Sequence, residues 1–91
     1  MYKFLIDNFF LNINIDDVVL EIGPGTGNLT KGILINKPKK LIVIEKDSNL
    51  SNRLEEKFKN KIKVINDDIL KIEENKLSNE KMIIFGNLPY N

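Results

Sequence analysis

Residues 18–30 read Val18-Val19-Leu20-Glu21-Ile22-Gly23-Pro24-Gly25-Thr26-Gly27-Asn28-Leu29-Thr30, where a run of strand-forming residues leads directly into three glycines. A near-continuous apolar run is typical of a buried strand in a parallel sheet. Glycines after such a strand let the backbone approach a ligand, because no Cβ stands in the way. The GxGxG spacing puts Asn28 where a dinucleotide fingerprint has glycine, which disfavours pyrophosphate binding. A structural turn without a ligand is the alternative to a cofactor loop.

Acidic residues follow the next two apolar runs. Glu45 ends the run that starts at Leu41 and stands about twenty residues after the glycine loop, where doubly wound folds contact a ribose. Its carboxylate can accept hydrogen bonds from two vicinal hydroxyls, and charged acceptors make the stronger bonds. After the run 62–66, Asp67 and Asp68 offer carboxylates to the 6-amino group of an adenine lying across the sheet. The alternatives are a solvated strand end at Glu45 and an ordinary surface turn at the two aspartates.

The final residues follow the apolar run 82–86 and have the composition of a clamp for an amino group. The Asn87 side-chain oxygen and the Leu88 carbonyl can accept both hydrogens of an exocyclic amine, while the Tyr90 ring offers a face for a planar base. Pro89 fixes its own φ and pushes Leu88 into an extended conformation. A strand end followed by a turn is the alternative, since Asn and Pro are common turn residues.

Apolar strand-like runs alternate with helical patterns along the chain, which predicts right-handed crossovers and a parallel sheet. The ligand-binding candidates then all lie at the carboxyl ends of strands, where open α/β sheets bind ligands. The expected elements are an amphipathic helix over 2–13, a strand over 18–22, helices over 28–35 and 48–59, strands over 41–45, 62–66 and 82–85, and a short helix or loop within 73–81.

Together the glycine loop, the two acidic strand ends and the Asn-Leu-Pro-Tyr motif resemble the S-adenosylmethionine-dependent adenine dimethyltransferases of ribosomal RNA, the KsgA/RsmA type. The resemblance covers nearly the whole chain and implies a Rossmann-like class I methyltransferase fold with four parallel strands in the order 3-2-1-4. It assigns cofactor binding and catalysis to two sets of residues. The cofactor set is Leu5, Gly23, Gly25, Gly27, Glu45, Asp68 and Asn87, and the catalytic set is Asn87, Leu88, Pro89 and Tyr90.

The implied reaction moves a methyl group from S-adenosylmethionine to adenine 6-amino groups in small-subunit ribosomal RNA. The Erm methyltransferases share the plan but modify large-subunit RNA. They usually carry Ser or Thr where Pro24 stands and Ile where Leu88 stands, so both positions favour the small-subunit branch. At the N-terminus only Phe4-Leu5-Ile6-Asp7 matches the family's opening segment, and Lys3 stands in place of the family's Asn. This departure weakens the assignment of a cofactor contact to Leu5.

The resemblance makes residues 1–91 a partial S-adenosylmethionine-binding domain, without the family's C-terminal sheet half and helical RNA-binding domain. We therefore expect the isolated chain not to methylate RNA, and its partner, small-subunit ribosomal RNA or a pre-ribosomal subunit, to bind through the missing region. A truncated remnant that at most binds cofactor is one alternative. A nicotinamide-dependent oxidoreductase is another, although it would leave residues 87–91 unexplained.

Composition narrows the chemistry further. The chain has neither cysteine nor histidine, which excludes thiolate and imidazole metal sites and imidazole catalysis. No apolar run approaches the ~20 residues of a membrane span, so we expect no membrane partner and a cytoplasmic location, or an organelle with an AT-rich genome. We also expect a monomer. With 14 basic and 13 acidic residues, the charge is nearly balanced. The basic stretches 37–40 and 57–63 are expected to be solvated charge rather than an RNA surface.

Overall fold

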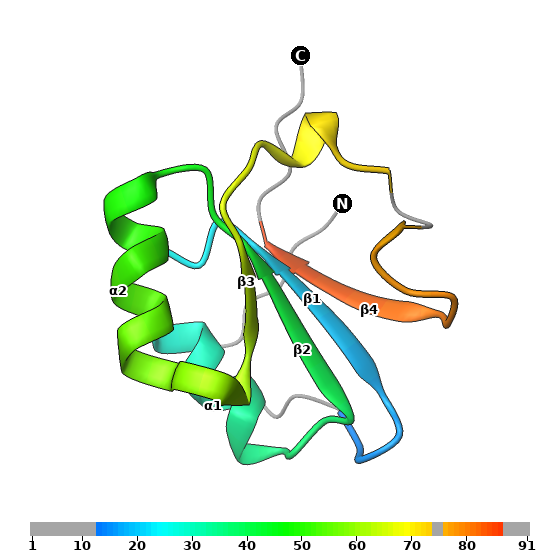
Figure 1. Cartoon of the computed structure of the whole chain (residues 1–91). Coiled ribbons are helices and arrows are strands. Elements are labelled where there is room, and N and C mark those ends of the chain that lie inside the picture. The colour runs from blue at the N-terminus through cyan, green and yellow to red at the C-terminus, as the bar shows by residue number, and fades with distance from the viewer. Residues whose placement is uncertain (1–12, 74–75, 87–91) are drawn as a thin grey trace.

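A computed structural model describes residues 13–73 and 76–86, which form one parallel four-stranded sheet in the order β3-β2-β1-β4 (Figure 1). This order confirms the prediction. The strands are β1 (Val18–Ile22), β2 (Lys40–Ile44), β3 (Lys63–Ile65) and β4 (Met82–Gly86). They are connected through α1 (Asn28–Ile35), α2 (Ser48–Phe58) and two single-turn 3₁₀ helices, η1 (Lys59–Lys61) and η2 (Ile69–Lys71).

The register aligns the carboxyl ends of all four strands. Ile22, the last residue of β1, pairs with Ile44 of β2 on one side and with Gly86 of β4 on the other. Ile44 in turn pairs with Ile65, the last residue of β3. The turns that follow the four strands therefore start in one row along a single edge of the sheet, which we call the carboxyl edge. The opposite edge, where the strands begin, is the amino edge.

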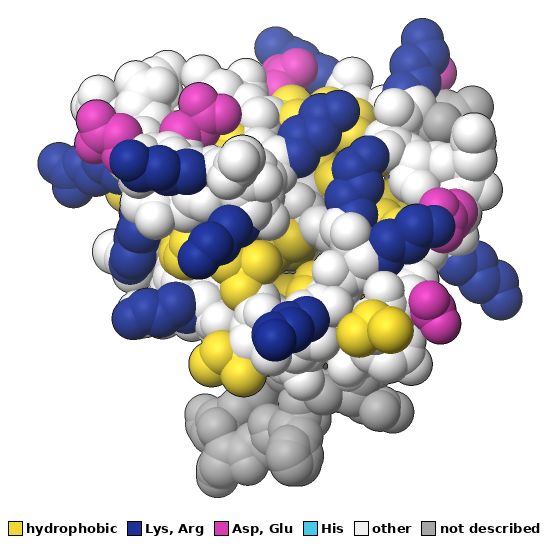
Figure 2. Space-filling model, turned by 60° about the horizontal axis from the view of Figure 1, so that its bottom comes forward, with side chains coloured by type: hydrophobic (Ala, Val, Ile, Leu, Met, Phe, Trp, Pro, Cys, Tyr) yellow, Lys and Arg dark blue, Asp and Glu magenta, His cyan; other side chains and the backbone are white. Residues whose placement is uncertain are grey.

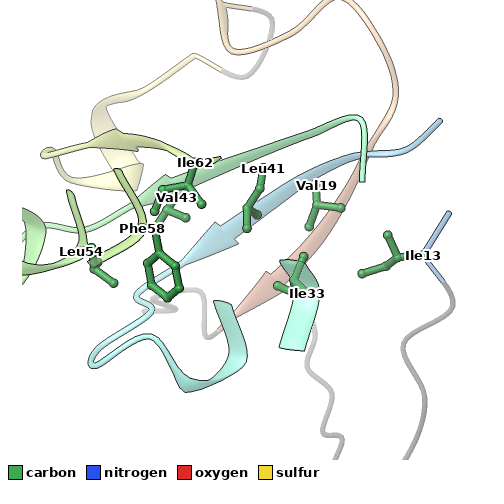
Figure 3. Close-up of a cluster of buried hydrophobic side chains, with 8 residues drawn as sticks. All are labelled: Ile13, Val19, Ile33, Leu41, Val43, Leu54, Phe58 and Ile62. Atoms are coloured by element: carbon green, nitrogen blue, oxygen red, sulfur yellow. The ribbon is translucent and has the colours of Figure 1, made fainter. Parts of the chain in front are cut away.

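Helices α1 and α2 cover one face of the sheet and enclose the larger core (Figures 1 and 3). β1 and β2 are apolar at nearly every position, since both faces of these central strands are buried. The side chains of this core lie between the strands and the two helices. They are Ile13, Val19, Ile33, Leu41, Val43, Leu54, Phe58 and Ile62.

The connection from β3 to β4 covers part of the other face. Its residue Leu77 is buried against the outward side chains of β1 and β2, and Ile69 and Ile72 pack beside it. A bidentate ion pair between Lys39 Nζ and the Glu80 carboxylate, at 2.8 and 3.0 Å, links the entry of β2 to the entry of β4. This connection therefore also ties the two strands together at the amino edge.

Most expected elements are present, with shifts at their ends. β2 begins and ends one residue earlier than expected, because its ladder to β1 starts with Lys40 opposite Val18, outside the apolar run. β3 is shorter, with three paired residues. The described part of 73–81 contains turns and no α-helix, while η2 was not expected. The helix expected over 2–13 lies almost entirely outside the described residues.

Among residues 13–73 and 76–86, none of the helices combines the length and the hydrophobicity that a membrane span requires.

Candidate cofactor and methyl-transfer site

The carboxyl edge brings together the predicted site residues that the structure describes. Gly23 begins the turn after β1, Glu45 directly follows β2, and Asp68 lies three residues beyond the end of β3. The other predicted site residues lie outside the described residues, namely Leu5, Asn87, Leu88, Pro89 and Tyr90. Gly86, which directly precedes the Asn-Leu-Pro-Tyr motif, is described and lies beside Ile22 of β1.

The glycine loop has a fixed course because its backbone requires glycine. Gly23, Gly25 and Gly27 have φ values of 65°, 60° and 94°, in the left-handed region that disfavours a Cβ. At Gly27 a Cβ would also stand 3.0 Å from Phe58 Cε2 and 3.1 Å from Leu54 Cδ2, whereas at Gly23 and Gly25 it would meet nothing within 4 Å. The loop therefore rests on α2 at its far end and leaves open space beside its first two glycines.

Backbone and side-chain bonds hold this loop at both ends. Gly23 N donates to Ile44 O at 2.9 Å, which fixes the loop's start to β2. Near its end, Lys57 Nζ donates to Thr26 O at 3.3 Å while lying 5.5 Å from the centroid of the Phe58 ring. The last turn of α2 thus supports the loop by charge as well as by packing.

A buried acid beneath the loop was not singled out from the sequence. Glu21, on β1, is 2% exposed and accepts a hydrogen bond from Thr30 Oγ1 of α1 at 2.5 Å. Burial raises the pKa of Glu21 from 4.5 to about 7, although the Thr30 bond acts in the opposite direction. The pair joins the two elements that flank the glycine loop. The available signal was an ionisable residue inside an otherwise apolar strand.

Glu45 is held with one carboxylate oxygen engaged. Its side chain is buried, its backbone N donates to Ile65 O at 3.0 Å, and its Oε2 accepts from Asp47 N at 2.9 Å. Asp47 in turn caps α2 by accepting from Leu50 N at 3.0 Å. Within the described ranges Oε1 of Glu45 has no hydrogen-bond partner, so it can accept hydrogen bonds from the hydroxyl groups of a ligand.

Asn66 is a second residue that sequence reasoning missed. Its side-chain amide donates to Glu45 O at 2.9 Å and to Lys46 O at 3.1 Å, and its Oδ1 accepts from Ser48 Oγ at 3.2 Å. These bonds join the turn after β3 to the turn after β2. Asn66 therefore positions the Glu45 backbone, a role invisible in a sequence where it reads as an ordinary strand end.

Asp68 occupies the next turn along the edge. Its Oδ1 caps η2 by accepting from Leu70 N at 3.0 Å, and its Oδ2 lies 3.7 Å from Lys46 Nζ. The side chain is 22% exposed, so an adenine amine can still reach it. Asp67 is exposed, and its Oδ1 accepts from the backbone N of Asp68 at 2.7 Å.

Gly86 explains how closely β4 approaches the glycine loop. Its φ is 132°, and a Cβ there would stand 2.3 Å from Ile22 O and 3.0 Å from Ile22 N. Only glycine lets the β4 backbone pass this close to the end of β1. Gly86, the last residue of β4, therefore lies next to the start of the loop.

The carboxyl edge is chemically suited to a polar organic cofactor. In residues 13–73 and 76–86 there is no cluster of three His, Cys, Asp or Glu side chains that could hold a metal ion. Its acids instead stand in separate turns, spaced along the row of strand ends. This arrangement can accept hydrogen bonds from several parts of one extended ligand.

Sequence comparison relates nearly the whole chain to one family and to curated members of it. The family described as "Ribosomal RNA adenine dimethylase" matches residues 4–91. "Ribosomal RNA small subunit methyltransferase A" of Pelagibacter ubique is 56% identical over 95 residues, covering 98% of this chain and 36% of the relative. The protein of the same name from a Sulfurihydrogenibium species is 44% identical, covering 89% and 33%. The chain thus spans about a third of the length of these relatives.

Solved structures support the same fold. The 23S rRNA methyltransferase ErmE superposes with a TM-score of 0.73 at 32% identity, over 87% of this chain and 32% of that one. A dimethyladenosine transferase from Plasmodium falciparum superposes with a TM-score of 0.72 at 33% identity, over 86% and 28%. The four-stranded sheet described above therefore has the architecture of these methyltransferases.

Proposed function

Because the chain belongs to the ribosomal RNA adenine dimethylase family, we propose that its carboxyl edge binds S-adenosylmethionine and contributes to methylation of adenine 6-amino groups in small-subunit ribosomal RNA. The observation that carries the proposal is the register. It sets the glycine loop, Glu45 and the turn containing Asp68 in one row, with Gly86 on the other side of β1. A cofactor lying along that row would present one end to the loop and the other to Asp68.

The described residues fit S-adenosylmethionine on their own chemistry. The space beside Gly23 and Gly25 admits the cofactor's amino acid portion against the backbone. Glu45 Oε1 would accept hydrogen bonds from the ribose hydroxyls, while Oε2 keeps its hydrogen bond from Asp47 N. The Asp68 carboxylate would accept a hydrogen bond from the adenine amine. When bound, the cofactor supplies a methyl group activated by a sulfonium.

The Asn-Leu-Pro-Tyr motif would hold the acceptor. The Asn87 side-chain oxygen and the Leu88 carbonyl would each accept one hydrogen of the target amine, which favours a pyramidal nitrogen with its lone pair directed outward. Tyr90 would stack on the flipped base, a contact worth roughly 1–3 kcal/mol, and Pro89 would keep the segment extended. Alignment of the reacting atoms would supply most of the acceleration, so no general base is required.

Small-subunit RNA is favoured over large-subunit RNA by the sequence relatives. The two structural neighbours are nearly equally similar, so the fold alone does not separate the branches. The names of the relatives at 56% and 44% identity both specify the small subunit. Pro24 and Leu88 point in the same direction.

Calorimetry with the 91-residue chain tests the cofactor assignment. We expect S-adenosylmethionine to bind more tightly than NAD, because the GxGxG loop has Asn28 where a pyrophosphate-binding loop has glycine. Equal or tighter binding of NAD would refute a methyltransferase site at this edge.

The test of methyl transfer uses a longer protein, a chimera that joins residues 1–91 to the remaining part of the Pelagibacter ubique relative. Asn87→Ala should lower turnover at saturating substrates far more than it weakens cofactor binding, since its bonds strengthen as the amine becomes pyramidal. Asn52→Ala, on the exposed surface of α2, is the matched control. Normal turnover by the Asn87 variant would exclude the clamp, and a preference for large-subunit RNA would exclude the small-subunit assignment.

A further inference from the structure

The amino edge gathers two basic stretches that lie apart in the sequence. Residues 36–44 and 59–66 contain six lysines and no acidic residue, whereas the rest of the chain has eight basic and thirteen acidic residues. The near-neutral total therefore conceals a strong separation of charge. The first stretch enters β2 and the second enters β3, and these strands are neighbours in the sheet.

The register shows how close the two stretches come. Lys63 pairs with Ile42, and Lys40 is two residues before Ile42 on the same strand, so both lysines point to the same face of the sheet. Diagonal neighbours of this kind are about 7–8 Å apart. Two stretches separated by the fourteen residues 45–58 thus form one continuous surface.

Little of this charge is compensated. We call the five exposed lysines Lys37, Lys40, Lys59, Lys61 and Lys63 the amino-edge lysines. None of them forms an ion pair with another described residue, whereas nearby Lys39 is paired with Glu80. Figure 2, with this side of the molecule forward, shows dark blue side chains across the middle of the face and magenta ones mainly toward its rim.

Two of these lysines stand where the backbone disfavours a side chain. Lys37 and Lys59 have φ values of 53° and 50°, the only non-glycine residues in the described ranges with positive φ. Both stand just after a helix, where glycine or asparagine is the favourable residue. Strained backbone at a defined surface points to function there.

We propose that the amino-edge lysines bind the phosphate backbone of RNA, which replaces the expectation from sequence alone that the stretches 37–40 and 57–63 are solvated charge. This inference rests on the proposed function, which supplies RNA as the partner. Exposed lysine ammonium groups act as mobile point charges that neutralise phosphates without reading bases. A five-residue strand is about 17 Å long, so these contacts would engage RNA well away from the target adenine. The amino edge would therefore anchor the substrate while the carboxyl edge carries the chemistry.

The test measures binding of a fluorescent, unstructured 20-nucleotide RNA by anisotropy at several salt concentrations. The Lys40→Gln/Lys63→Gln variant should bind roughly tenfold more weakly at low salt, and the slope of log affinity against log salt should fall by about 1.4, since each lost phosphate contact removes about 0.7. The control Lys31→Gln/Arg53→Gln removes the same charge from exposed positions on α1 and α2. It should stay within about twofold of the parent chain.

Three results would overturn the proposal: equal losses in the edge and control variants, no loss in either, or equally tight binding of a polyglutamate peptide, which would indicate an acidic protein partner. Calorimetry with S-adenosylmethionine on the same variants separates this inference from the proposed function. Unchanged cofactor binding beside lost RNA binding supports both. Absent cofactor binding in every variant refutes the cofactor site, and the RNA measurement still decides the role of the lysines.

Discussion

The two edges of the sheet both contain turns with positive φ, but different residue types occupy these positions. At the carboxyl edge, the turn after β1 uses glycine wherever φ is positive. The Asn66 side chain bonds the turn after β3 to the turn after β2, and within that second turn the Glu45 side chain accepts from Asp47 N. At the amino edge, the turns after α1 and α2 use Lys37 and Lys59 at positive φ. Among the described residues, positive φ angles thus fall on glycine at the carboxyl edge, and at the amino edge on lysine, where the proposed RNA contacts would use the charge.

The largest loss of stability is expected from Gly86→Ala at the carboxyl edge. The added Cβ would overlap Ile22 O at a φ that alanine avoids, so β4 must move away from β1. We expect the free energy of unfolding to fall by about 4 kcal/mol in urea denaturation, the sum of backbone strain and overpacking. Gly32→Ala is the control, since a Cβ there meets nothing and α1 should gain about 0.5–1 kcal/mol. Comparable effects of the two substitutions would contradict the close approach.

Glu21→Gln should change how stability depends on pH. Burial raises the folded-state pKa of Glu21 to about 7, while its unfolded value is 4.5, so between these values the folded state binds more protons. The free energy of unfolding of the parent chain, relative to the Gln variant, should therefore fall as pH rises from 4.5 to 7, by on the order of 3 kcal/mol, and then level off.

The control for this titration is Thr30→Val, measured by urea denaturation across the same pH range. It keeps the carboxyl group but removes the hydrogen bond that lowers its pKa, so the window should move to higher pH. A parent chain and Gln variant with parallel stability curves would show that Glu21 is not buried as described.

Glu45→Ala should weaken S-adenosylmethionine binding by about 2 kcal/mol, the scale of hydrogen bonds to a charged group. Glu55→Ala removes the same charge from the exposed surface of α2 and should leave affinity unchanged in calorimetry. Equal affinities of the parent chain and the two variants for S-adenosylmethionine would show that Glu45 does not bind the ribose.

The smallest expected effect lies at the amino edge. Lys37→Gly should raise the free energy of unfolding by about 0.5–1 kcal/mol, because glycine adopts its positive φ without strain. Lys31→Gly, inside α1, should lower it by about 1 kcal/mol. If Lys37→Gly stabilises the chain and also weakens RNA binding, the lysine costs stability and contributes charge. If Lys37→Gly destabilises the chain, the Lys37 backbone is not strained.

Local pattern was sufficient for most of the fold. The apolar run of β1 and the helix after the glycines were predicted with the bounds that the structure shows. Strand order came from the family resemblance, because local sequence does not encode which strands become neighbours. The polar stretch before β4 was ambiguous for a related reason: its conformation depends on Leu77 packing against strands more than thirty residues away.

Sequence alone singled out the residues whose type implies chemistry by itself, namely the glycines, Glu45 and Asp68. The structure sets them in one row at the carboxyl edge, and their roles in binding stay predictions. Glu21, Thr30 and Asn66 were missed because their roles arise from bonds between elements that are distant in sequence. The assignments to Leu5 and to Asn87–Tyr90 stay predictions, since these residues lie outside the described ranges.

The central position of β1 has a consequence for how the chain acquires its structure. In the register, Val18 is 22 residues from its partner in β2 but 64 from its partner in β4. Closing the longer loop costs roughly 1 kcal/mol more in chain entropy, and distant parallel pairings form slowly. We therefore expect β1 and β2 to pair first and β4 to dock late. One side of β1 would stay unpaired until β4, the strand that precedes the Asn-Leu-Pro-Tyr motif, has docked. Assembly of the methyl-transfer site would then be the last event of folding.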